Sequence, residues 1–179
     1  SEEIREYAIK ESVDNKVNLD DYYLEFGVFK GAGINLFSKF VKKIYGFDGF
    51  EGLKEDWKGF RNQKGVCNLD GTIPKVNNNV VIIKGWVQDT LIPFLKEHSP
   101  AINFIHIDLD TYESSKFVLE NVKPYMNNEC IILFDELYNY PGWEVGEFKA
   151  LKEVFDENEY EYLAFAINGE QAVIKYIKS

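Results

Sequence analysis

Short apolar runs alternate along the chain with longer stretches in which apolar residues recur every three or four positions. Five runs have the length and composition of buried strands; they are Tyr22–Phe26, Lys43–Asp48, Val80–Lys84, Ile102–Asp108 and Cys130–Asp135. The periodic stretches predict amphipathic helices, at Glu2–Ser12, after Gly33, at Thr90–His98, at Thr111–Asn121 and from Val145 to Val154. We expect Asp89 and Asp110 to cap the third and fourth of these helices.

The order of these elements predicts the fold. Strands that alternate with helices form a parallel sheet with helices on both faces. Two further β-like runs, Glu161–Ile167 and Gln171–Ile177, flank Asn168-Gly169, which is a strong hairpin signal. We therefore predict one α/β domain over residues 1–179, with a Rossmann-like, doubly wound, mostly parallel seven-stranded sheet and a C-terminal antiparallel hairpin.

The stretch Tyr22–Gly33 predicts a strand, a tight turn and a helix, and it is the first candidate site. Gly27, Gly31 and Gly33 would let a ligand approach the backbone N–H groups at the helix N-terminus. Glu25 places a carboxylate beside that ligand, which disfavours the pyrophosphate of a dinucleotide. S-adenosylmethionine, with its ammonium and sulfonium groups, fits better. A plain turn of an α/β protein is the alternative.

An acidic residue ends the second predicted strand. Asp48 follows Gly27 by about 20 residues, the position at which nucleotide-binding βαβ units carry the acid that binds ribose hydroxyls. Phe50 either lies against a purine or anchors the loop. The glycine-rich residues 49–79 predict a long, partly irregular excursion that forms one wall of an acceptor pocket.

Further candidates follow the later strands, because ligands of parallel sheets bind beyond the carboxyl ends of the strands. We expect Trp86 and Val87 to flank an adenine and Gln88 to form a hydrogen bond with its edge. His106 lies inside a predicted strand, and we expect it to be a core histidine. Asp108 and Asp135 end two strands that we expect to be neighbours. The full set of predicted cofactor-binding residues is Glu25, Gly27, Phe29, Gly31, Asp48, Gly49, Phe50, Trp86, Val87, Gln88 and Asp108.

The net charge and the composition limit the classes of partner that this chain could bind. The net charge of −10 argues against nucleic acid, because phosphate binding needs clustered Lys and Arg. No apolar run has the length of a membrane span, and no signal-peptide pattern is present. Cys67 and Cys130 favour a reduced, cytoplasmic protein, although their pairing stays open. We expect a small-molecule acceptor as partner, without nucleic acid or membrane, and a homo-oligomer stays open.

Five stretches together resemble the class I S-adenosylmethionine-dependent methyltransferases, and more narrowly the macrocin O-methyltransferase family. They are LEFGVFKGAG, YGFDGFEGL, KGWVQDTL, HIDLDTYESS and FDELYNYPGW, in this order. The resemblance covers nearly the whole chain, and the closing hairpin matches that fold. It implies methyl transfer to a hydroxyl of a sugar or natural product. It also implies cofactor contacts at Glu25, Gly27, Asp48, Gln88 and Asp108.

The resemblance also implies a metal. In metal-dependent members of the family, a strand-tip Asp and a following Asp-Asp pair hold magnesium. Asp108 matches the first position, and Asp135-Glu136 stands in place of the pair. Glu is a competent oxygen ligand, so Mg²⁺ at Asp108, Asp135 and Glu136 is expected. The acceptor hydroxyl loses its proton either to Asp108 as general base or with the help of this cation.

Two other functions stay open from the sequence. The chain could be a non-catalytic cofactor-binding or interaction domain, with its acids as solvated loop residues. It could also be a nicotinamide-dependent oxidoreductase, although the spacing G-x-x-x-G-x-G differs from G-x-G-x-x-G and no Lys-Tyr pair for a hydride site is evident. The chain starts with Ser1, so the sequence does not establish where the protein begins.

Overall fold

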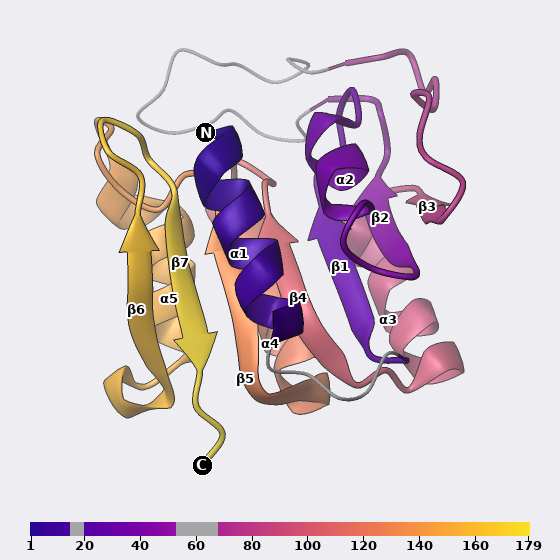
Figure 1. The fold of residues 1–179 in the computed structure, drawn as a ribbon. Coiled ribbons are helices and arrows are strands. Elements are labelled where there is room, and N and C mark those ends of the chain that lie inside the picture. Colours follow the sequence, from indigo (N-terminus) through magenta and orange to yellow (C-terminus); the bar gives the residue numbers. More distant parts are fainter. Residues whose placement is uncertain (15–19, 53–67) are drawn as a thin grey trace.

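The computed structural model describes residues 1–14, 20–52 and 68–179, and its strands form one sheet (Figure 1). The strands are β1 Tyr22–Phe26, β2 Ile44–Asp48, β3 Val80–Lys84, β4 Ile102–Ile107, β5 Met126–Phe134, β6 Tyr160–Phe165 and β7 Ala172–Tyr176. Their order is β3-β2-β1-β4-β5-β7-β6. The first five strands are parallel, and the hairpin of β6 and β7 joins β5 antiparallel. The predicted fold class is confirmed.

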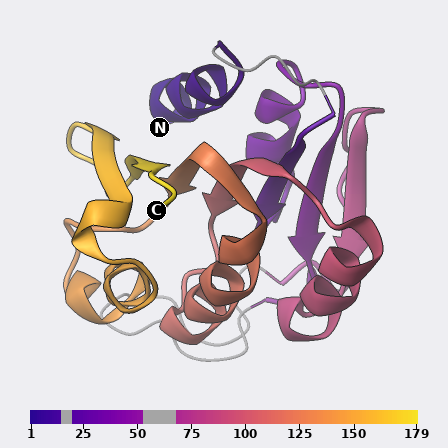
Figure 2. The same ribbon diagram turned by 90° about the horizontal axis from the view of Figure 1, so that it is seen from below.

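Helices cover both faces of the sheet (Figures 1 and 2). One face carries α1 (Glu2–Asp14) and α2 (Ala32–Phe37), and the other carries α3 (Val87–His98), α4 (Tyr112–Val122) and α5 (Glu147–Val154). Two apolar cores result, one on each side of the sheet. Among the described residues, no helix has the length and apolar character needed to cross a membrane.

The alternation of side chains along the strands decides which polar groups meet. Leu24 belongs to the core under α3, α4 and α5, whereas Tyr23 belongs to the core under α1 and α2. Glu25 lies two residues after Tyr23 and therefore points to the α1 face. His106 follows Phe104 in β4 in the same way, and β1 pairs with β4 so that Glu25 and His106 are register partners. Two charged side chains are thus brought together inside the sheet.

The start of α3 differs from the prediction. The helix begins at Val87, with Trp86 at the N-cap position, so Asp89 lies in the first turn and is not the cap. An acid is still favourable there because of the helix dipole. His98, the last residue of the helix, packs its ring against Tyr22, and its Nδ1 lies 3.2 Å from the Tyr22 hydroxyl.

The start of α4 differs for a similar reason. Thr111 is the N-cap, and its side-chain oxygen accepts a hydrogen bond from the Ser114 N–H at 3.4 Å. A threonine at the N-cap, in the extended conformation, can accept a hydrogen bond from a free N–H group of the first helical turn as well as an aspartate can. Asp110, which was expected to be the cap, precedes the helix with a φ of +62°. Its carboxylate is therefore available to the site described below.

The long excursion between β2 and β3 is only partly described. Residues 53–67, which include Cys67, lie outside the described residues. Residues 68–79 contain turns and an isolated bridge between Asn68 and Glu51, as the glycine-rich sequence predicted. The predicted acceptor wall in this excursion stays a prediction.

The two glycines that frame the turn after β1 should respond differently to substitution. Gly27 has a φ of +92°, and a Cβ atom there would overlap the backbone carbonyl of Asp108. Gly31 has a φ of +87°, but its Cβ would lie no closer than 3.4 Å to a neighbour. We expect Gly27→Ala to lower the free energy of unfolding by about 3 kcal/mol or more, and Gly31→Ala by about 1 kcal/mol. Urea denaturation measures both, and equal losses would contradict the close approach at Gly27.

Candidate active site

A pocket opens at the carboxyl edge of the parallel strands, where the turn after β1 faces the loops after β2, β3 and β4. Most of the predicted cofactor-binding residues line it: Gly27, Phe29, Asp48, Gly49, Trp86, Val87, Gln88 and Asp108. The sequence analysis missed the pocket residues Leu109, Asp110, Thr111 and Ser114. Their position directly after β4 is the signal that could have found them, because this edge of the sheet carries the ligand.

Three of the predicted residues do not line the pocket. Phe50 is 1% exposed and packs in the core under α1 and α2, which is the loop-anchor alternative. Gly31 caps α2, and its Cβ direction faces Asn35 rather than the pocket. Glu25 is 1% exposed and lies on the α1 side of the sheet. The structure therefore separates Glu25 from the pocket that was expected to contain it.

Asp48 fastens the turn after β1 to the loop after β2. Its Oδ2 accepts hydrogen bonds from the backbone N–H groups of Val28 and Phe29, both at 2.8 Å. Its Oδ1 accepts a third from the N–H of Phe50 at 2.7 Å. A carboxylate offers about four acceptor positions, so Asp48 keeps room on Oδ1 for one more donor. Asp48 therefore fixes the shape of the turn beside the pocket as well as lining the pocket.

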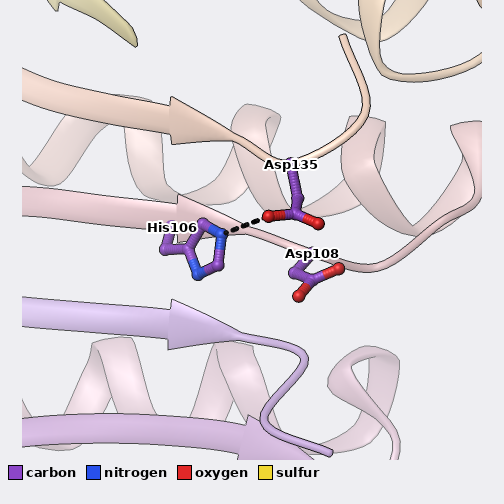
Figure 3. Close-up of side chains that lie close together, drawn as sticks. All are labelled: His106, Asp108 and Asp135. Atoms are coloured by element: carbon purple, nitrogen blue, oxygen red, sulfur yellow. Dashed lines mark hydrogen bonds and ion pairs between the residues drawn. The ribbon is translucent and has the colours of Figure 1, made fainter. Parts of the chain in front are cut away.

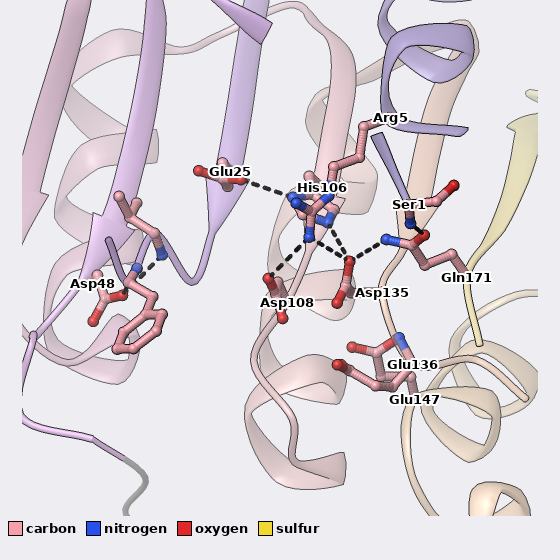
Figure 4. A network of polar contacts seen from close by, with 12 residues as sticks. Ser1, Arg5, Glu25, Asp48, His106, Asp108, Asp135, Glu136, Glu147 and Gln171 are labelled. Carbon is pink, nitrogen blue, oxygen red and sulfur yellow. Dashed lines mark hydrogen bonds and ion pairs between the residues drawn. The ribbon is translucent and has the colours of Figure 1, made fainter. Parts of the chain in front are cut away.

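A chain of alternating charges runs along the α1 side of the strand ends (Figure 4), and Figure 3 shows His106, Asp108 and Asp135 within it. His106 donates from Nδ1 to Glu25 at 2.8 Å and from Nε2 to Asp135 at 3.4 Å. Arg5, which comes from α1, lies 3.0 Å from Asp135 and 4.0 Å from Asp108. Each buried carboxylate in this chain thus has a cationic neighbour, as a buried charge requires.

The pKa shifts agree with this order of charges. Burial alone lowers the pKa of His106, but its bonds to Asp135 and Glu25 outweigh that effect and raise the pKa to about 10. Burial raises the pKa of Glu25, and the hydrogen bond from His106 offsets this rise only in part. Although burial opposes ionisation of Asp135 too, His106 and then Arg5 hold the pKa of its carboxyl well below its usual range. His106 is therefore a buried imidazolium and not merely a satisfied core histidine.

A second group of acids lies on the other side of the strand ends. Glu136 and Glu147 are 8% and 1% exposed, and the backbone N–H of Glu136 donates to Glu147 Oε2 at 3.1 Å (Figure 4). Glu136 Oε2 and Glu147 Oε1 are buried without a hydrogen-bond partner. Burial, followed by the neighbouring acids, raises the pKa of both carboxyls well above the usual range. This cluster is short of positive charge.

The structure divides the three predicted metal ligands between these two sides. Asp108, Asp110 and Glu136 bring carboxylate oxygens within 4.8 Å of one another, and so do ligand atoms of His106, Asp108 and Asp135. Asp135 and Glu136 are consecutive residues, but Asp135 meets Arg5 of α1 whereas Glu136 lies beside Glu147 of α5 (Figure 4). The predicted trio of Asp108, Asp135 and Glu136 does not form such a group among the described residues.

Of the two groups, the one with Asp110 and Glu136 suits a hard divalent cation. Its donors are all carboxylate oxygens, the ligand type that Mg²⁺ and Ca²⁺ prefer. One of these oxygens is buried and unpartnered. In the other group both ring nitrogens of His106 are already engaged, and Arg5 supplies positive charge.

The chain matches the family model described as a methyltransferase domain over residues 24–137. This match covers more than half of the chain, and the protein belongs to this methyltransferase family. Among curated protein sequences, no match to the chain was found.

Solved structures of methyltransferases share the fold. The calicheamicin methyltransferase CalS11 superposes with a TM-score of 0.78 at 22% identity, over 97% of this chain and 77% of that one. The O-methyltransferase NovP gives 0.67 at 15% identity, over 99% and 79%. An O-methyltransferase from Bacillus cereus in complex with S-adenosylhomocysteine gives 0.60 at 13% identity, over 96% and 80%. The predicted class I methyltransferase fold is thereby confirmed.

The buried imidazolium predicts a pH-dependent stability. A raised pKa in the folded state stabilises the protein fully below pH 6.5, and this stabilisation is lost as the pH rises to about 10. We expect the free energy of unfolding to fall by a few kcal/mol over this range, measured by urea denaturation. His106→Gln should show a clearly smaller fall. The same fall in both proteins would contradict a charged His106.

Proposed function

We propose that this chain is an S-adenosylmethionine-dependent O-methyltransferase that acts on a hydroxyl of a small molecule, with assistance from a divalent cation. The observation that carries the proposal is the composition of the pocket. We call the part of the pocket lined by Asp48 and the Trp86 loop its nucleoside end and the part lined by Asp108 and Asp110 its acidic end. Gly27 lies against the backbone of Asp108. A nucleoside end and an acidic end within one cavity are what methyl transfer to a hydroxyl requires.

The nucleoside end suits the adenosine part of the cofactor. Trp86 and Val87 offer apolar surface to an adenine, and Gln88 lies beside them, with its Nε2 donating to Ser114 at 3.1 Å. Asp48 keeps one acceptor position for a ribose hydroxyl. The close approach of Gly27 to Asp108 leaves bare backbone beside the cofactor. The alternative of a nicotinamide dinucleotide is disfavoured by the acids at the far end.

The acidic end suits deprotonation of the acceptor. Methyl transfer is an in-line displacement in which the acceptor oxygen bonds the methyl carbon as the carbon–sulfur bond breaks. The hydroxyl proton goes to Asp108, whose pKa is raised well above its usual range by burial and by the nearby Asp135. A carboxylate with a raised pKa is a better general base near neutral pH.

The metal-assisted part of the proposal rests on the group of Asp108, Asp110 and Glu136. A bound divalent cation would lower the pKa of the acceptor hydroxyl and offset the charge of these acids. Asp110 and Glu136 would serve as its ligands together with Asp108. This group replaces the trio with Asp135 that the resemblance implied.

The acceptor class is also a proposal. One structure of CalS11 is described as that of a TDP-rhamnose 3'-O-methyltransferase, and it supports a sugar or natural-product hydroxyl as the acceptor. An rRNA methylase is among the structures of the same fold. The net charge of −10 disfavours RNA as the acceptor of this chain. A non-catalytic cofactor-binding domain is the second candidate, since it would bind the same cofactor without turnover.

Calorimetry should identify the cofactor. We expect S-adenosylhomocysteine and S-adenosylmethionine to bind and to raise the melting temperature, and NAD to do neither. Trp86→Ala should weaken S-adenosylhomocysteine binding by about 1–3 kcal/mol, since stacking against an aromatic ring is lost. Trp143, whose ring packs on Phe148 outside the pocket, gives the control Trp143→Ala with unchanged affinity. Binding of NAD alone would reject the proposal.

Chelation should reveal the metal. With a competent hydroxyl acceptor, EDTA should lower the rate of methyl transfer by about tenfold or more, and Mg²⁺ should restore it. Glu136→Gln should require more Mg²⁺ for recovery, because one of the three close carboxylates is lost. Glu97→Gln, an exposed acid of α3, is the matched control. Full activity in EDTA would leave Asp108 to act as a base without a cation.

A further inference from the structure

We propose that Arg5 is a positioning residue: it holds Asp135 as its counter-ion and keeps this carboxylate out of the ligand set of a divalent cation. The cation is left with Asp108, Asp110 and Glu136. The inference rests on the proposed metal-assisted function. It assigns a role to α1, for which the sequence predicted only an amphipathic helix.

The first argument is the saturation of one oxygen atom. Asp135 Oδ1 accepts from Arg5 at 3.0 Å, from Gln171 at 2.6 Å and from His106 at 3.4 Å (Figure 4). Three donors fill the lone pairs of this oxygen. A cation that used Asp135 through Oδ1 would have to displace at least one of these donors.

The second argument is the anchoring of Arg5. The helix α1 packs through the buried residues Ile4, Ala8 and Ile9 against the sheet core. The guanidinium therefore reaches Asp135 from a fixed backbone, and the Arg5 side chain is only 23% exposed. Arginine does not lose its charge at any accessible pH. Asp135 thus keeps a permanent cation beside it.

The third argument is the contrast with the opposite side of the strand ends. Glu136 is buried and has an oxygen without a hydrogen-bond partner, whereas Asp135 has a cation on two sides. The two residues are consecutive and directly follow β5, yet Asp135 meets Arg5 of α1 whereas Glu136 lies beside Glu147 of α5. A divalent cation lowers the energy most on the side that lacks positive charge.

Arg5 also acts on Asp108, which both sides share. Its Nη2 lies 4.0 Å from Asp108 Oδ2, close enough for the positive charge to repel a cation bound to that carboxylate. Loss of the guanidinium should therefore strengthen cation binding twice, by removing this repulsion and by freeing Asp135. The geometry thus predicts that Arg5 weakens the cation site while it selects its ligands.

The experiment measures Mn²⁺ binding by calorimetry on the intact chain without an acceptor. We expect Arg5→Gln to bind Mn²⁺ about tenfold more tightly than wild type, or better. The double variant Arg5→Gln with Asp135→Asn removes one positive and one negative charge together. If Asp135 is no ligand, this variant should stay within about threefold of the wild-type affinity.

Two further variants separate charge from position. Lys10→Gln removes a positive charge from the same helix and should leave the Mn²⁺ affinity unchanged. Lys10 pairs with Glu6 and is not among the residues that line the pocket. Arg5→Lys keeps the charge and should remain close to wild type. Circular dichroism checks that each variant is folded; if the double variant does not fold, the comparison of Arg5→Gln with Arg5→Lys still tests the proposal.

Two results would overturn the proposal. A loss of about tenfold or more in the double variant would make Asp135 a ligand. Unchanged or weaker binding in folded Arg5→Gln would show that Arg5 does not restrain the site. Absence of Mn²⁺ binding in every protein would overturn the proposal as well. The methyltransferase function itself is judged separately, by binding of S-adenosylhomocysteine to the same samples.

Discussion

The burial of like charge at the strand ends is the constraint on which the site depends. Parallel strands bring their carboxyl ends to one edge, and β1, β4 and β5 each deliver an acid there, at Glu25, Asp108 and Asp135. Without cations these charges would repel one another in a poorly solvated region. Two residues supply positive charge beside these acids: His106, which lies within β4, and Arg5, which lies in α1. The first helix is therefore part of the electrostatics of the site and more than a cover for the sheet.

The two ends of the pocket differ in how their carboxylates are stabilised. At the nucleoside end, a single carboxylate binds three backbone N–H groups, so Asp48 fixes the shape of the turn through hydrogen bonds that cost little to make. Next to the acidic end, Glu136 and Glu147, which are not among the residues that line the pocket, remain buried with unpartnered oxygens. A buried polar oxygen without a hydrogen-bond partner destabilises the fold. The proposed cation would offset this cost, whereas Asp48 holds the turn after β1 through its own three hydrogen bonds.

Sequence patterns predicted the sheet because its signals are local. Apolar runs, a hairpin dipeptide and glycine spacing each reflect interactions within a few residues, and the alternation of strands with helices predicts a parallel sheet. The edge position of Asp48, Gln88 and Asp108 was predictable for the same reason. The side on which each acid points was harder. Asp135 and Glu136 looked like one pair along the chain, yet the loop after β5 places Asp135 beside Arg5 of α1 and Glu136 beside Glu147 of α5.

The remaining differences involve partners that are distant in sequence. The sequence predicted Glu25 to be a ligand contact. In the structure, Glu25 binds His106, which lies 81 residues later in the chain, inside the sheet. His106 itself looks like an ordinary core histidine until Asp135 appears at its other nitrogen. Arg5 carries no motif at all, because its role depends only on where α1 docks. Charge balance at a buried site is a property of the whole assembly of strands and helices, so short motifs identify the acids of this site but not the cations that make their burial possible.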